Sequence, residues 1–80
     1  MTTTHKSQSV FGTDLPPRML SLLLRIQGEY HEMPGLSLTE AQAQRMWGLD
    51  RRTCSVALGM LTELRVLQRT DRGSYVQQSD

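Results

Sequence analysis

Residues 39–64, TEAQAQRMWGLDRRTCSVALGMLTEL, carry the signals of two helices joined by a very short turn. Thr39 is a favourable N-cap, because its hydroxyl accepts a hydrogen bond from a free N–H group at a helix start. Gln42, three residues later, completes a capping box. Gly48 ends the first helix where a left-handed residue is needed, and Asp50 is an N-cap for the next one. The stretch therefore predicts a helix, a turn of about three residues and a second helix.

This spacing is typical of a helix-turn-helix motif. The second helix begins with Arg51 and Arg52, at the end of the helix that enters a DNA groove in such folds. Ser55 lies on the same outer face, and all three side chains are suited to phosphates and base edges. Farther along, Val56 and Gly59 make this face small and smooth, which favours close approach of another helix or backbone. We predict that Arg51, Arg52 and Ser55 contact DNA.

The spacing of apolar residues assigns the inward faces of both helices. The residues predicted to point inward are Ala43, Met46, Trp47 and Leu49 in the first helix and turn, and Cys54, Ala57, Leu58, Leu61 and Leu64 in the second helix. An exposed Trp47 would stack on bases, but its apolar neighbours favour a place in the core. Cys54 falls on the inward stripe, so we interpret it as a small core residue and not as a reactive thiol.

Upstream, Asp14 followed by two prolines in the first turn predicts the start of a helix that runs from about Pro16 to about His31. Its predicted buried face consists of Leu15, Met19, Leu22, Leu23, Ile26 and Tyr30. Leu20 and Leu24 widen that face, so the helix is either covered on more than one side or contacts another subunit. Residues 36–38 alternate apolar and polar side chains, which predicts a very short strand.

Downstream, residues 65–77 predict a β-hairpin. Its arms are residues 66–69 and 74–77, and its turn is Thr70-Asp71-Arg72-Gly73, with Asp early and Gly last. Leu67 and one or both of Tyr75 and Val76 should face the helices. Arg69 and Arg72 project near the tip, and we predict that they also contact DNA.

Length and charge set the limits of the domain. Eighty residues form one small domain, which we place at residues 14–77, between a flexible N-terminal tail (1–13) and a polar C-terminal tail (78–80). The net charge is only +1. Between residues 45 and 72, however, six arginines face three acidic residues, a net of +3, whereas residues 1–44 carry three basic and four acidic residues, a net of −1. Positive charge therefore gathers where DNA contacts are predicted.

Several classes of protein are disfavoured. No apolar run reaches the roughly eighteen residues that span a bilayer, and the N-terminus lacks a signal-peptide pattern. The single cysteine agrees with a reducing compartment, so we expect a cytoplasmic protein without a membrane partner. Two histidines and scattered acids assemble neither a metal site nor a catalytic constellation. We therefore expect no enzyme activity, no metal and no cofactor.

The order helix, short strand, helix-turn-helix, hairpin resembles that of small bacterial winged-helix transcription regulators, the broad group that includes MarR-like and ArsR-like repressors. The resemblance covers residues 15–77 and is carried by LTEAQAQRMWGLDRRTC (38–54) and RVLQRTDRGSYVQ (65–77). It implies an α+β fold of three helices with a two- or three-stranded wing. It further implies that residues 50–64 are a recognition helix for the major groove of double-stranded DNA, and that residues 69–73 are a wing tip on the backbone or minor groove. The alternative function is a winged-helix module that dimerises or binds another protein.

Overall fold

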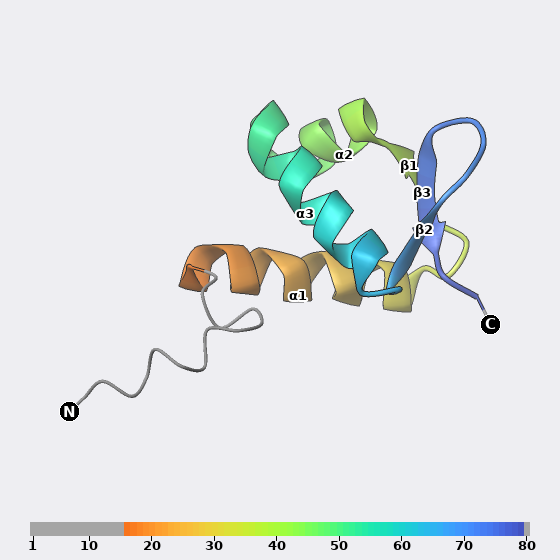
Figure 1. Ribbon diagram of the computed structural model, residues 1–80, viewed down its shortest axis with the longest axis horizontal. Helices are drawn as coiled ribbons and strands as arrows, with labels where there is room; N and C mark the ends of the chain where they lie inside the picture. Colours follow the sequence, from red (N-terminus) through yellow and green to blue (C-terminus); the bar gives the residue numbers. More distant parts are fainter. Residues whose placement is uncertain (1–15, 80) are drawn as a thin grey trace.

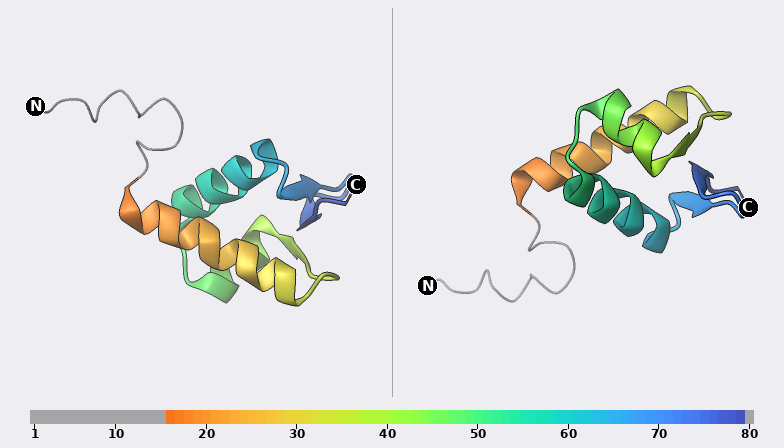
Figure 2. Two further views of the ribbon diagram at one scale, coloured as in Figure 1. Left: turned by 90° about the horizontal axis from the view of Figure 1, so that it is seen from below. Right: turned by 90° about the horizontal axis from the view of Figure 1, so that it is seen from above.

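The computed structural model describes residues 16–79, which form three helices and a three-stranded antiparallel sheet, an α+β arrangement compatible with a winged-helix layout. The order along the chain is α1 (Pro17–Glu32), β1 (Ser37–Thr39), α2 (Glu40–Trp47), α3 (Arg51–Glu63), β2 (Leu67–Arg69) and β3 (Ser74–Gln77). In Figure 1, α1 lies along the lower edge, α2 lies at the upper edge, and the sheet closes one end. The views from below and above in Figure 2 show α1 and α3 diverging toward the sheet.

Helix α1 begins at the predicted pair of prolines. Pro16 is its N-cap residue and Pro17 its first helical residue, a position where the missing N–H group costs no helical hydrogen bond. The helix ends at Glu32, one residue later than predicted. The predicted cap Asp14 and the predicted core residue Leu15 lie outside the described residues.

The capping signals of the central stretch are confirmed. Thr39 Oγ1 accepts a hydrogen bond from Gln42 N at 3.2 Å, and Gln42 Oε1 accepts one from Thr39 N at 2.9 Å. Gly48 has φ +63°, in the left-handed region, which glycine adopts without steric cost. Asp50 caps α3 by accepting a hydrogen bond from Thr53 N at 3.4 Å. The three residues from Gly48 to Asp50 thus set the direction in which α3 leaves α2.

The sheet has the strand order β1–β3–β2. Hairpin β2–β3 pairs Leu67 with Gln77 and Arg69 with Tyr75, and β1 pairs with β3 so that Leu38 lies opposite Tyr75. Because side chains alternate across a strand, Leu67 and Tyr75 lie on the same face, toward the helices. The hairpin pattern left open whether Tyr75, Val76 or both face the helices, and in the structure Tyr75 packs against the core. Strand β3 has the predicted bounds, β2 begins one residue later than predicted, and β1 is shifted by one residue at both ends.

The core combines residues of all three helices and β2: Leu23, Ile26, Tyr30, Ala43, Trp47, Cys54, Ala57, Leu58, Leu61 and Leu67. The placement of Trp47 and Cys54 in the core is confirmed, and the rings of Tyr30 and Trp47 lie 6.4 Å apart. The Tyr30 hydroxyl donates a hydrogen bond to the carbonyl of Tyr75 at 2.8 Å. This bond joins α1 to β3, the central strand of the sheet.

Two predicted core residues are exposed. Met46 is 43% exposed because Ala43 and Trp47, four residues apart, already form the inward face of this eight-residue helix. Leu64 is 64% exposed because α3 ends at Glu63 and the chain then turns away. Leu20 and Leu24 are also exposed, at 49% and 61%. Within a single chain, therefore, α1 is covered on one side only.

Candidate nucleic-acid interface

The predicted DNA-contacting residues of α3 share one exposed face. Arg51, Arg52 and Ser55 are all exposed in the first two turns of the helix. At about 100° per residue, Ser55 lies within about 60° of both arginines around the helix axis, so the three side chains point to one side. The Asp50 carboxyl accepts hydrogen bonds from Thr53, which lower its pKa below the usual value. The charged cap therefore persists at neutral pH and holds the start of this face in place.

The rest of the outer face of α3 offers little to a nucleic acid. Val56 and Gly59 are exposed, as predicted, and carry no polar side-chain atom. The Thr62 hydroxyl donates to the carbonyl of Leu58 at 2.8 Å, a local bond that satisfies its donor. The polar chemistry of α3 is thus concentrated in its first two turns.

The hairpin places the two remaining predicted residues on the surface. Arg69 and Arg72 are both exposed. The turn between the strands is closed by hydrogen bonds from Gly73 N to the Thr70 carbonyl at 3.0 Å and from Ser74 N to Thr70 Oγ1 at 3.1 Å. The guanidinium carbon of Arg69 lies 5.9 Å from the centre of the Tyr75 ring, within the range of a cation–π contact. Arg69 is therefore held against the sheet, while Arg72 lies in the turn itself.

The two groups of arginines lie on separate elements. In Figure 1, α3 begins at the upper left and the hairpin loop lies at the upper right, both on the side away from α1. The structure therefore brings Arg51, Arg52 and Ser55 together, and places Arg69 and Arg72 as a second group on the hairpin. A partner that contacts both groups must extend along this edge of the molecule.

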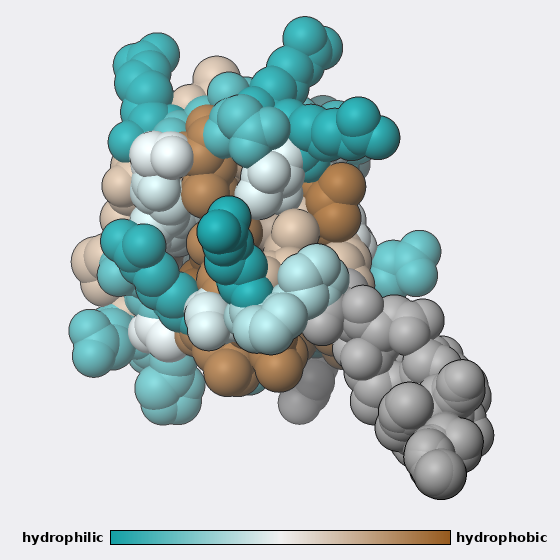
Figure 3. Space-filling view, turned by 90° about the vertical axis from the view of Figure 1, so that its left-hand side faces the viewer, coloured by the Kyte–Doolittle hydropathy of each residue, from teal (hydrophilic) through white to brown (hydrophobic). Residues whose placement is uncertain are grey.

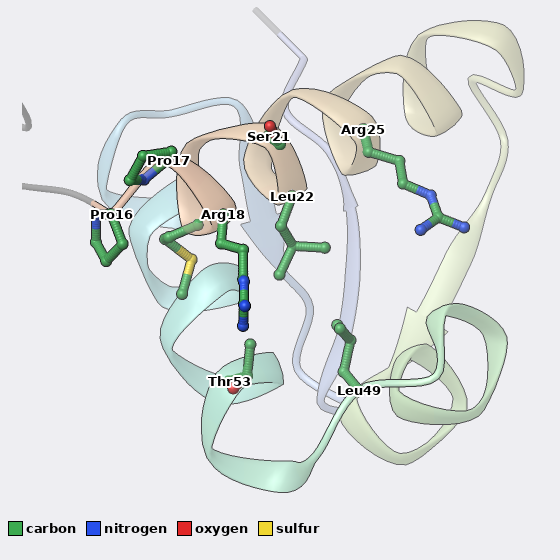
Figure 4. Close-up of a pocket in the computed structure, with 9 residues that line it drawn as sticks. Pro16, Pro17, Arg18, Ser21, Leu22, Arg25, Leu49 and Thr53 are labelled. Carbon is green, nitrogen blue, oxygen red and sulfur yellow. The ribbon is translucent and has the colours of Figure 1, made fainter.

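Besides the arginine groups of α3 and the hairpin, the structure has another surface that was not predicted, with both polar and apolar side chains. Figure 3 views the end of the molecule where α1 and α3 begin, and shows hydrophobic surface recessed between projecting hydrophilic side chains. Here a hollow is bounded by Arg18, Leu22 and Arg25 of α1 and by Leu49 and Thr53 of the following turn and helix (Figure 4). The signal in the sequence is the 18, 22, 25 spacing, which places both arginines and the leucine on one flank of α1.

The buried cysteine lacks the features of a reactive thiol. Cys54 is fully buried, and its thiol donates to the carbonyl of Glu40 at 3.7 Å. Burial raises the pKa of this thiol, and the negative charges of Glu40 and Asp50 raise it further. Reactive cysteines have a lowered pKa and access to solvent. Cys54 therefore acts as a packing residue.

Two further findings concern the described part of the chain. Among residues 16–79, no group of three histidine, cysteine, aspartate or glutamate side chains is arranged to hold a metal ion. None of the helices α1 to α3 has the length and apolar character needed to cross a membrane.

Comparisons with protein-family models, with curated proteins and with solved structures found no match to this chain.

Proposed function

We propose that this chain binds double-stranded DNA in a sequence-specific manner, as a small transcriptional regulator with a winged-helix domain. In this proposal α3 enters the major groove with its first two turns, and the β2–β3 hairpin is the wing that contacts the backbone or the minor groove. The main supporting observation is that Arg51, Arg52 and Ser55 are exposed together at the capped start of a helix that follows a three-residue turn.

The residue types support base contacts as well as phosphate contacts. Arginine forms paired hydrogen bonds with guanine, and serine bonds to several base edges. Arg69 and Arg72 on the hairpin add positive charge near the same edge of the molecule. Because Val56 and Gly59 offer no polar group, we assign specificity to Arg51, Arg52 and Ser55 and general affinity mainly to the hairpin.

A selection from a random duplex library, followed by fluorescence anisotropy on the enriched duplex, tests the proposal. Arg52→Ala should weaken specific binding by about 10- to 100-fold, since a good arginine–base pair contributes about 1–3 kcal/mol. Arg72→Ala should weaken binding to all duplexes and reduce the slope of log affinity against log salt by about 1.

Arg65→Ala is the matched control, because it removes the same charge at the opposite end of α3. If no duplex binds at low salt, or if Arg52→Ala behaves like Arg65→Ala, the DNA-binding proposal is wrong.

A second candidate function, protein binding or dimerisation, is favoured by the exposed leucines of α1. Leu20 and Leu24 lie one turn apart, and Val56 in α3 and Leu64 directly after it are 44% and 64% exposed. Small domains often gain stability by association, and exposed apolar surface supplies the driving force. Light scattering during size-exclusion chromatography tests this candidate: wild type should elute as a dimer and Leu24→Glu as a monomer. A monomeric wild type that captures no protein partner would count against it.

A further inference from the structure

The hollow at the start of α1 has the size and chemistry of a ligand site. It is lined by Pro16, Pro17, Arg18, Met19, Ser21, Leu22, Arg25, Leu49 and Thr53, and its volume is about 780 Å³. Sites for small molecules commonly have volumes of about 300–1,000 Å³. Figure 4 draws the residues that line the hollow.

The inner wall of the hollow is apolar. Met19, Leu22 and Leu49 are partly buried and pack against the core with their inner sides, which leaves apolar atoms facing the hollow. Because apolar surface gains free energy when it leaves water, this wall favours a ligand with an apolar body.

The rim of the hollow is positively charged. Arg18 and Arg25 are both exposed and line the hollow. They are two turns of α1 apart, a rise of about 10 Å along the axis, with Leu22 between them on the same flank. In Figure 4, Arg18 extends toward the first turn of α3, where Thr53 lies. Asp50 places a negative charge beside Thr53, but the lining side chains themselves include two arginines and no acidic residue, so the rim along α1 favours an anion.

We propose that this hollow binds an organic carboxylate with an apolar body. The carboxylate lies beside the Arg18 guanidinium, and the apolar body lies along Leu22 and Leu49. Arg25, at the far end of the hollow, adds positive potential without contacting the carboxylate. The paired N–H groups of a guanidinium match the two acceptor atoms of a carboxylate.

The site adjoins the start of α3, so its occupancy should affect DNA binding; this part rests on the proposed function. Leu49 and Thr53 flank the segment from Asp50 to Arg52, and Thr53 N donates to the Asp50 cap. A bound carboxylate adds a negative charge near Arg51 and Arg52 and therefore weakens their attraction for phosphates. By linkage, bound DNA weakens ligand binding by the same factor.

A titration of the full chain with octanoate, followed by ¹⁵N and methyl NMR, tests the site without DNA. Octanoate should shift the signals of Leu22, Leu49 and Thr53 with a Kd on the order of 1 mM, as expected for a small ligand in an open site. Octan-1-ol and octylammonium should bind at least about tenfold more weakly, because they lack the charge that the rim selects.

Substitutions separate charge recognition from adsorption to an apolar surface. Arg18→Gln should weaken octanoate binding at least about fivefold, Arg25→Gln about twofold, and the control Arg45→Gln, in α2, should leave it unchanged. Equal binding of octanoate and octan-1-ol would overturn the proposal, as would equal effects of Arg18→Gln and Arg45→Gln.

Anisotropy with the selected duplex tests the coupling. Octanoate at saturation should raise the Kd for DNA about threefold relative to acetate at equal concentration, and Arg18→Gln should abolish this difference. If octanoate binds but the DNA affinity does not change, the coupling is overturned and the site stands. If no duplex binds at all, the proposed function fails, and the titration alone still decides the ligand site.

Discussion

Replacement of Arg65 by glycine should stabilise the protein. Arg65 is the one non-glycine residue with positive φ among residues 16–79, at φ +64°. It follows α3, where its N–H donates to the carbonyl of Thr62 at 3.0 Å and the next N–H, of Val66, donates to the carbonyl of Leu61 at 2.9 Å. These two bonds form a Schellman motif, in which the left-handed position is usually occupied by glycine.

The expected gain follows from two opposing terms. A side chain in the left-handed region costs about 1–2 kcal/mol. Glycine avoids this cost but loses more conformational freedom on folding, which costs about 0.4–1 kcal/mol. The net gain for Arg65→Gly is therefore about 0.5–1 kcal/mol, and for a domain of this size it should raise Tm by about 3–6 °C.

Urea unfolding followed by the fluorescence of Trp47, the single tryptophan, measures this gain. Arg65→Ala is the matched control, because it removes the same charge and keeps a Cβ atom in the left-handed region. The free energy of unfolding of Arg65→Gly should exceed that of Arg65→Ala by about 0.5–1 kcal/mol. If the two variants agree within about 0.3 kcal/mol, or if alanine is the more stable, the backbone at this position is not strained as argued.

Other predictions concern the turn before α3 and the bond between α1 and the sheet. Gly48→Ala should cost about 1 kcal/mol in the free energy of unfolding, since φ is +63°, whereas Gly28→Ala, in the open middle of α1, should gain about 0.5–1 kcal/mol; thermal unfolding followed by circular dichroism separates them. Tyr30→Phe removes the hydrogen bond to the Tyr75 carbonyl and should cost about 1–2 kcal/mol in urea unfolding, while Tyr75→Phe keeps that bond and should change little. Burial, with smaller contributions from Cys54 and Tyr75, raises the pKa of Tyr30 from 10.0 to about 12. The neutral phenol is thus favoured in the folded state, so this stabilisation is complete below pH 10 and is lost as the pH rises from 10 to 12. Tyr30→Phe should lack this part of the alkaline loss in a pH series.

The capping residues could be predicted because they act locally. Thr39 and Gln42 bond across three residues, and Asp50 bonds to Thr53 across the same interval. Such bonds depend on residue type and spacing, and both are visible in a sequence. Gly48 could be predicted for a similar reason, because glycine indicates a local backbone conformation and does not depend on a packing contact.

The inward faces were predicted less well because burial depends on distant elements. A helix of eight residues presents only about two turns, and the buried residues of α2 are Ala43 and Trp47. Met46, about 100° from Trp47 around the axis, is left outside. Leu64 continues the spacing of the α3 stripe, but the helix ends one residue earlier, and the turn at Arg65 directs the chain toward β2.

In the sheet, too, the feature formed by neighbouring residues could be predicted, and the contact between distant residues could not. The hairpin turn was predicted from Thr70 to Gly73, whereas the pairing of β1 with β3 joins residues more than thirty positions apart. Thr39 has two roles, since it pairs with Ser74 in the sheet and also caps α2. The predicted strand therefore ended one residue early, because a residue assigned to a cap was not also assigned to a strand.

The chemistry of the candidate interface could be predicted, but its arrangement could not. Exposure of Arg51, Arg52 and Ser55 follows from their place on the outer face of a helix. The contact of Arg69 with the Tyr75 ring depends on the register of the hairpin, which the sequence restricts but does not determine. The hollow beside Arg18 depends on how α1 crosses the start of α3, which no local signal specifies.

The turn before α3 determines how the two proposed sites can influence each other. The N–H groups of Gly48 and Leu49 both donate to the carbonyl of Gln44, and Asp50 caps the helix that follows. With the backbone fixed by these bonds, a ligand beside Leu49 has little freedom to move Arg51 and Arg52, so its effect on DNA binding should be electrostatic. Exposed charges about 10 Å apart are largely screened at 0.1 M salt. The threefold effect of octanoate on DNA affinity should therefore shrink steadily between 0.05 and 0.5 M salt in the anisotropy assay, with octanoate kept at saturation throughout (about ten times its Kd at each salt concentration). An effect that persists unchanged across this range would instead mean that the ligand rearranges the turn.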